Sequence, residues 1–129
     1  MMKNIPLKAT EKELEILQII WKKGSASVKD VHEGLGGDEI NGYTTILKLM
    51  QIMHEKGLLT RQKQGKLHLY EAVSTLEKTR QQILDKMIQT IFQGSATQLV
   101  MSALGNKKSS KEDLHEIKKY LEKLEGGDS

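Results

Sequence analysis

Side chains that could carry out chemistry are sparse in this chain of 129 residues. Its histidines are scattered and form no i, i+4 pair of the kind found on a zinc-binding helix; they are His32, His54, His68 and His115. The sequence contains no glycine-rich phosphate loop and no nucleophile elbow. A lone histidine is more often a surface or packing residue than a ligand, and methionines are more often core residues than part of a cofactor site. We therefore expect no enzymatic activity, no metal site and no cofactor.

The chemistry that the sequence favours is the binding of a polyanion. Between Asn41 and Tyr70 a single acidic residue, Glu55, stands against five basic residues. The basic residues are Lys48, Lys56, Arg61, Lys63 and Lys66. This stretch carries more than the formal net charge of the whole chain, +3, so it indicates nucleic acid as a partner better than the pI of 9.0 does. The alternative is a solvated basic face.

Composition is typical of a small globular protein. The chain is 37% hydrophobic and 29% charged, and no run approaches the ~18 apolar residues that suggest a membrane span. The N-terminal stretch MMKNIPLKATEKE has no apolar core of secretory type, and the absence of cysteine excludes disulfides and thiolate metal sites. We expect a cytoplasmic protein without membrane insertion, built as one small head with an appended segment.

Two helices are predicted before the basic stretch. Thr10 and Glu13 form a capping box for a first helix that continues to about Lys23. Ser27 then caps a short second helix with apolar residues at helical spacing, which ends in the glycine-rich stretch of residues 34–37.

The basic stretch begins with a third predicted helix, with Asn41 as its cap and Gly57 at its end. One face of this helix is apolar and consists of Ile46, Leu49, Met50 and Met53. The opposite face is polar and consists of Thr44, Lys48, Gln51 and Glu55.

A β-hairpin is predicted to follow. The runs LLTRQKQ and KLHLYEA are short enough for strands, the second alternates through Leu67 and Leu69, and Gln64-Gly65 can supply the positive φ of a tight turn. Three helices and a hairpin make a winged helix-turn-helix, which we assign to residues 1–73. Its third helix could enter the major groove of DNA, while Arg61, Lys63 and Lys66 lie over phosphates. The alternatives are a module that binds a protein and a nonspecific DNA-binding protein.

Residues 74–129 show long helical patterns, and the fold expected for the whole chain is mainly α with a small β-hairpin. Three helices with few loops cannot close a large core alone, so we expect them to form a helical dimerisation domain. The last helix carries a heptad-like seam. The predicted interface consists of Ile83, Met87, Ile91, Leu99, Leu114, Ile117, Leu121 and Leu124. The alternative is that these helices fold back over Ile16, Ile19 and Ile20 of the head.

Four segments together resemble a known family. They are TEKELEILQIIWKKGSASVKDV, YTTILKLMQIMHEKGLL, GKLHLYEAV and FQGSATQLVMSAL. In this order they look like the penicillinase-repressor family, the BlaI/MecI/CopY group of winged-helix transcriptional repressors, and the resemblance extends from about Leu7 to Leu124. It implies a homodimer whose N-terminal heads bind palindromic operator DNA and whose C-terminal helices dimerise. In the antibiotic-resistance members, a membrane sensor triggers cleavage of the repressor, so a sensor protease is an implied partner.

The resemblance also implies positions for the contacts. It places DNA contacts at Tyr43, Thr44 and Thr45, along the third helix that includes Lys48 and Gln51, and in a wing from Arg61 to Lys66. Two departures, Leu47 and Ile52, stand where many relatives have basic residues, so the operator sequence of the relatives does not transfer. The Asn-Phe pair cleaved in the resistance repressors corresponds here to Ser102-Ala103, and the absence of cysteine excludes induction by copper through a cysteine-rich motif.

Overall fold

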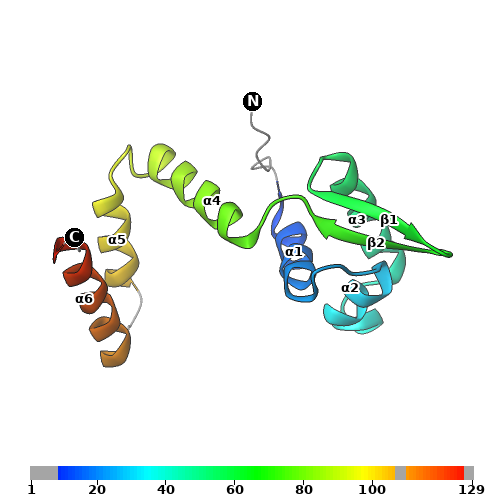
Figure 1. Ribbon diagram of the computed structural model, residues 1–129, viewed down its shortest axis with the longest axis horizontal. Helices are drawn as coiled ribbons and strands as arrows, with labels where there is room; N and C mark the ends of the chain where they lie inside the picture. Colours follow the sequence, from blue (N-terminus) through cyan, green and yellow to red (C-terminus); the bar gives the residue numbers. More distant parts are fainter. Residues whose placement is uncertain (1–8, 107–109, 127–129) are drawn as a thin grey trace. The chain divides into compact units, whose positions relative to one another are not determined.

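The computed structural model describes residues 9–106 and 110–126. In the described residues, three helices and a hairpin precede three further helices (Figure 1). The elements are α1 (Glu11–Lys23), α2 (Val28–Gly34), the 3-10 helix η1 (Gly37–Glu39), α3 (Tyr43–Glu55), β1 (Leu59–Gln64), β2 (Leu67–Ala72), α4 (Leu76–Thr90), α5 (Ala96–Asn106) and α6 (Lys111–Gly126). The predicted fold class is confirmed. No helix in these residues is long and apolar enough to cross a membrane. The expectation that the N-terminal stretch has no secretory apolar core rests largely on residues 1–8, which lie outside the described residues.

The first two helices begin with capping boxes. The Glu13 N–H donates to Thr10 Oγ1 at 3.1 Å, and the Thr10 N–H donates back to Glu13 Oε1 at 3.0 Å, as the sequence predicts. Ser27 and Asp30 repeat this arrangement at the start of α2. There the Ser27 backbone N–H holds the pKa of Asp30 below its usual value. Because this pKa is lowered by folding, the contribution of Asp30 to stability is present above its unfolded pKa and is lost as the pH falls.

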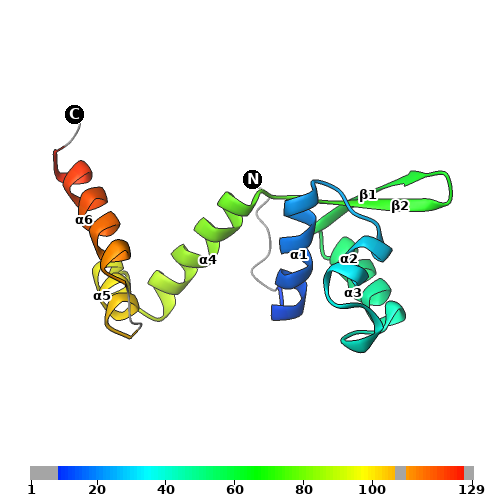
Figure 2. The same ribbon diagram turned by 90° about the horizontal axis from the view of Figure 1, so that it is seen from below.

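One core joins the first three helices to the hairpin (Figure 2). It is formed by Ile16, Leu17, Ile20, Ala26, Val28, Val31, Ile46, Met50, Met53, Leu58, Leu59 and Tyr70. Three of these residues come from the apolar face predicted for α3, and the fourth predicted member of that face, Leu49, packs against the core. Ile16 and Ile20 are fully buried within this core, so the head itself covers two of the α1 residues over which the C-terminal helices were considered to fold.

The hairpin is held to the rest of the head by its second strand. β1 and β2 pair antiparallel around a turn at Gly65-Lys66, one residue later than the predicted Gln64-Gly65, because Gln64 still pairs with Leu67. Gly65 has the expected positive φ, +62°. Tyr70 exchanges two backbone hydrogen bonds with Ala26, at 3.0 and 2.8 Å, so the segment between α1 and α2 pairs with β2. The alternation through Leu67 and Leu69 does not mark the core face of β2. The buried residue of the strand is Tyr70, and Leu67 is 57% exposed.

The start of α3 differs from the prediction. The N-cap is Gly42 rather than Asn41, and no side chain caps the helix. Gly57 follows its end with a φ of +86°, as expected for a residue in the left-handed region. The prediction at the start was wrong because Asn41 has the residue type of a cap, whereas the 3-10 turn before α3 moves the first helical residue to Tyr43.

The chain forms two compact units, with the division between Asp85 and Lys86, inside α4. The first turns of α4 belong to the unit of the head: Trp21 Nε1 donates to the Ser74 carbonyl at 2.8 Å, and Thr79 is buried. The functional boundary after Val73 stays a prediction. In the second unit, none of the described side chains is buried.

A partly buried ion pair joins the start of α1 to the end of α3. Lys56 Nζ donates to Glu13 Oε1 and Oε2 at 2.8 and 3.0 Å, and Glu13 is only 2% exposed. Replacing Glu13 by Ala removes both this carboxylate and the capping acceptor for Thr10. We expect the free energy of unfolding to fall by about 2–4 kcal/mol, measured by chemical denaturation.

Glu15→Ala is the matched control on the same helix. Glu15 pairs with Lys12 at 3.4 Å, and both side chains are well exposed to solvent. Such a pair contributes at most about 0.5 kcal/mol. A Glu13→Ala variant that is as stable as the Glu15→Ala variant would show that the partly buried pair does not hold the two helices together.

Candidate nucleic-acid interface

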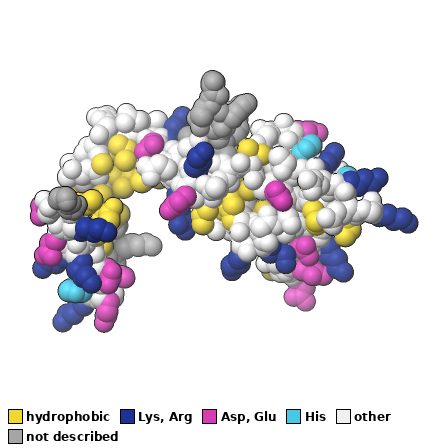
Figure 3. Space-filling view, in the orientation of Figure 1, with side chains coloured by type: hydrophobic (Ala, Val, Ile, Leu, Met, Phe, Trp, Pro, Cys, Tyr) yellow, Lys and Arg dark blue, Asp and Glu magenta, His cyan; other side chains and the backbone are white. Residues whose placement is uncertain are grey.

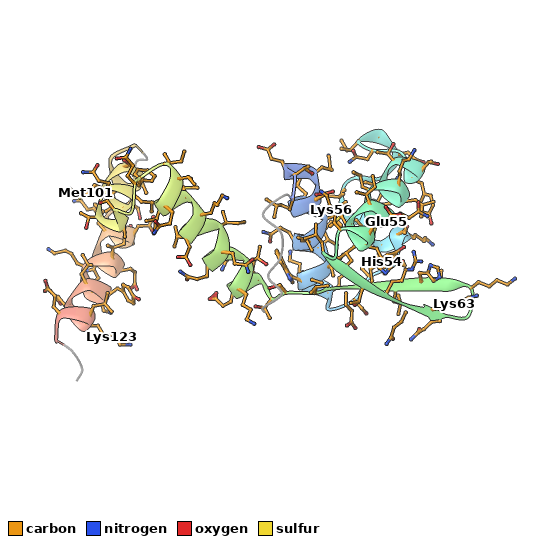
Figure 4. All side chains as sticks on the ribbon, turned by 90° about the horizontal axis from the view of Figure 1, so that it is seen from above. His54, Glu55, Lys56, Lys63, Met101 and Lys123 are labelled. Atoms are coloured by element: carbon orange, nitrogen blue, oxygen red, sulfur yellow. The ribbon has the colours of Figure 1, made fainter. Side chains whose placement is uncertain are left out.

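The polar face predicted for α3 is exposed along the whole helix. Thr44, Lys48, Gln51 and Glu55 are all open to solvent, whereas Ile46, Met50 and Met53 on the other side are fully buried. The helical period explains this division, because residues three or four positions apart share a face. Figure 4 labels Glu55 at the end of this face, beside His54 and Lys56. The face presents hydroxyl, ammonium, amide and carboxylate groups, all of which can hydrogen-bond to base edges.

The first turn of α3 is exposed and has no side-chain cap. Tyr43 is 45% exposed, and Thr44 and Thr45 are exposed as well. The N-cap Gly42 has no side chain that could accept a hydrogen bond from the first backbone N–H groups of α3. These groups form the positive end of the helix dipole, which favours an anion. The three residues that the resemblance implies as DNA contacts are therefore grouped at this end.

The pairing register determines which wing residues share a face. Arg61 lies opposite Tyr70 and Lys63 lies opposite His68, so these four side chains are on one face of the hairpin. Gln62, Gln64, Leu67 and Leu69 are on the other face. We call Arg61, Lys63 and His68 the basic wing face. Lys66 lies in the turn beside Gly65 and outside the paired residues.

His68 is a member of this face that the sequence analysis did not select. Its ring is 6.5 Å from that of Tyr70, edge to face, and its side chain is exposed. The predicted turn at Gln64-Gly65 would have placed position 68 opposite Arg61. The observed turn at Gly65-Lys66 places it opposite Lys63, so the register identifies this residue only once the turn is known. Figures 3 and 4 show basic side chains around the hairpin end, with Lys63 labelled there.

The predicted dimer residues lie in α4, α5 and α6, apart from Ile91, which follows the last residue of α4, and their apolar side chains are largely uncovered. Ile91 is 70% exposed, and Leu124 is 59% exposed. Met87, Leu114 and Leu121 are also exposed, and Ile83, Leu99 and Ile117 are half-buried. Other exposed apolar residues of the same helices, not selected from the sequence, are Leu84, Val100, Met101 and Tyr120. Ile83 and Leu84 belong to the first unit, and the others give the second unit an exposed apolar surface.

The described residues contain no cluster of three or more histidine or carboxylate side chains that could hold a metal ion. The exposed surfaces of α3 and the hairpin carry hydrogen-bonding side chains and basic residues, with Glu55 as the acidic residue of the polar face of α3. This arrangement can hold a polyanion and hydrogen-bond to it.

Comparisons with known proteins agree with this geometry. Residues 9–123 match the model of the penicillinase repressor family. The chain is 23% identical over 122 residues to the methicillin resistance regulatory protein MecI of Staphylococcus aureus (strain N315), covering 95% of this chain and 99% of that protein. It is 26% identical over 125 residues to the penicillinase repressor of Bacillus licheniformis, covering 94% of each.

Solved structures show the same fold. The solution structure of the DNA binding domain of the repressor BlaI is 27% identical, with a TM-score of 0.51, and the match covers 60% of this chain and 93% of that chain. A MarR family protein from Bacillus stearothermophilus, 16% identical, matches with a TM-score of 0.54 over 92% of this chain and 74% of its own. The second likeness concerns the fold alone. The chain therefore belongs to the penicillinase repressor family: it is a winged-helix transcriptional repressor and not an enzyme.

Proposed function

We propose that this repressor is a homodimer that binds palindromic operator DNA through α3 and the wing and is released by an inducing signal. The observation that carries the proposal is the exposed polar face of α3, flanked in the same compact unit by the basic wing face. A protein-binding head would instead present an apolar face on this helix. Because the proposed target is operator DNA, we expect the repressor to act in the cytoplasm.

The two surfaces have different tasks in this proposal. Lys48 and Gln51 lie on the α3 face, where side chains of these types can hydrogen-bond to bases, so they contribute to the choice of sequence. Lys63 and Lys66 lie near the hairpin end, where a cation neutralises phosphate whatever the sequence. Specific and nonspecific affinity should therefore respond differently to substitutions in the two places.

We expect Lys48→Ala or Gln51→Ala to weaken binding to the preferred site by about 1–3 kcal/mol where the side chain touches a base edge. Lys63→Ala or Lys66→Ala should weaken all sequences alike and reduce the salt slope by roughly one. The site is first selected from a random duplex pool with the unmodified chain. Titrations of that site and of a scrambled duplex at several salt concentrations then measure both effects.

Lys123→Ala is the charge-matched control, because Lys123 lies on α6, outside the head (Figure 4). It should change the affinity for either duplex by less than about twofold at physiological salt, where distant exposed charges are screened. Normal DNA binding by all four interface variants would contradict the assignment of α3 to the groove.

The dimer is proposed from the seam on α6. Leu114, Ile117, Leu121 and Leu124 are spaced 3, 4 and 3 residues apart, and three of the four are exposed in the single chain. A symmetric dimer would cover this seam with the same residues of a second copy. Two linked heads can hold both halves of a palindrome, and this linkage raises affinity well above that of one head.

Ile117→Asp would place an unpaired charge in this seam, so we expect monomers and the loss of tight binding to the palindrome. Analytical ultracentrifugation measures the first effect and operator titration the second. Lys119→Asp, on the opposite side of the same helix, should leave a dimer. If the Ile117→Asp variant sediments as an unchanged dimer, the seam is not the interface.

Induction is proposed to act on the C-terminal helices. In the resistance repressors that the sequence resembles, an Asn-Phe bond is cut, and the matching residues here, Ser102 and Ala103, are exposed within α5. A protease pocket shaped for a large aromatic side chain would make much less apolar contact with Ala103. The binding free energy lost is about that of burying one aromatic ring, a few kcal/mol. This chain therefore answers to a protease of different preference or to another signal.

The intact mass of the repressor in its host, followed before and after exposure to a β-lactam, tests this proposal. We expect no fragment that ends at Ser102, because the aromatic contact is missing. The appearance of that fragment would show that the substituted bond is still cut and would refute the proposal.

A further inference from the structure

His32 lies where α2, η1 and α3 meet, and it is nearly buried, at 9% exposure. Its Nε2 is 2.9 Å from the carbonyl oxygen of Asn41 and 3.1 Å from Asp38 Oδ1. Its ring lies 5.6 Å from the ring of Tyr43, nearly perpendicular to it at 80°. The side chain therefore contacts residues on both sides of Gly42, the N-cap of α3.

The contacts of His32 matter for the start of α3, because the N-cap there is Gly42. Most helices are fixed at their start by a side-chain cap, as α1 and α2 are here, but α3 has none. Glycine also restricts the backbone less than any other residue does. The direction in which α3 leaves the turn must therefore be set by other contacts, and His32 supplies one before Gly42 and one after it.

The hydrogen bond has a defined direction. A carbonyl oxygen and a carboxylate oxygen both accept, so His32 Nε2 carries the hydrogen and donates it. The Asn41 carbonyl is the partner of greater weight, because it is fixed in the backbone, whereas the Asp38 side chain is 84% exposed. Loss of His32 would leave the Asn41 carbonyl without this donor and Tyr43 without its edge contact.

We propose that His32 is a positioning residue for DNA recognition: by donating to Asn41 and packing against Tyr43, it fixes the first turn of α3, which carries Tyr43, Thr44 and Thr45. This inference rests on the proposed function, because it concerns which sequence the head selects. His32 does not itself touch DNA. It acts by holding the side chains of the first turn at the spacing that base contacts require.

Two substitutions separate the positioning role from simple packing. His32→Gln keeps an N–H at the position of Nε2, whereas His32→Leu fills the site without a donor. We expect His32→Leu to weaken binding to the selected duplex about tenfold, the size of one lost hydrogen bond. Binding to the scrambled duplex should change less than about twofold, because phosphate contacts tolerate small shifts. His32→Gln should restore specific binding to within about threefold of the original.

Asp38→Ala is the matched control. It removes the other acceptor near Nε2 but leaves the bond to Asn41, so specific affinity should stay within about twofold. Equal losses on both duplexes in His32→Leu, with a lowered melting temperature and no rescue by Gln, would assign His32 a merely structural role. Unchanged specific binding in His32→Leu would also overturn the inference.

Hydrogen exchange of the DNA-free chain makes the test independent of the proposed function. The Ile46 N–H donates to the Gly42 carbonyl at 3.2 Å and reports on opening of the first turn. Its exchange should be about tenfold faster in His32→Leu and should be restored in His32→Gln, with exchange at Met53 unchanged. If the unmodified chain does not discriminate between the duplexes, the proposed function fails. If exchange at Ile46 is unchanged in His32→Leu, the inference that His32 positions α3 is refuted.

Discussion

The wing depends on the attachment of Tyr70 to the segment between α1 and α2. A two-stranded hairpin is marginal in water on its own, so β1 and β2 need support from the rest of the head. Tyr70 provides it through two backbone hydrogen bonds with Ala26 and through a ring that is 1% exposed in the core. The same core buries Ile46, Met50 and Met53 and so turns the opposite face of α3 to solvent. One packed cluster therefore positions both surfaces proposed to bind DNA.

Local signals in the sequence predict much of this arrangement. The capping box at Thr10 and Glu13 involves residues three apart, and the faces of α3 follow from its period, so both could be predicted without tertiary information. The turn at Gly65 and the order of elements had equally local signatures. The pattern of segments was sufficient to indicate the family, and the match of residues 9–123 to the family model confirms it.

Interactions between distant residues could not be predicted in this way. Glu13 appears in the sequence as a capping residue, yet its carboxylate also pairs with Lys56, 43 positions away. Tyr70 is the buried residue of β2, where Ala26 pairs with it, whereas the alternation through Leu67 and Leu69 indicated the other face of the strand. His32 was interpreted as an ordinary surface or packing residue. Its contacts with Asn41 and Tyr43 depend on the turn that brings α2 against the start of α3.

The two compact units differ in how they use apolar residues. The head buries twelve apolar residues in one core, although others such as Ile40 and Leu67 stay exposed. The described helices beyond Asp85 bury none of theirs, as the proposed dimer requires. The central claim is that the head binds DNA through α3 and the wing. Mapping amide NMR shifts of the chain on adding a selected palindromic duplex tests this directly. We expect the shifts to concentrate at Thr44, Lys48 and Gln51 of α3 and at Arg61 and Lys63 of the wing. Shifts confined to other surfaces of the head, with α3 unaffected, would contradict the account.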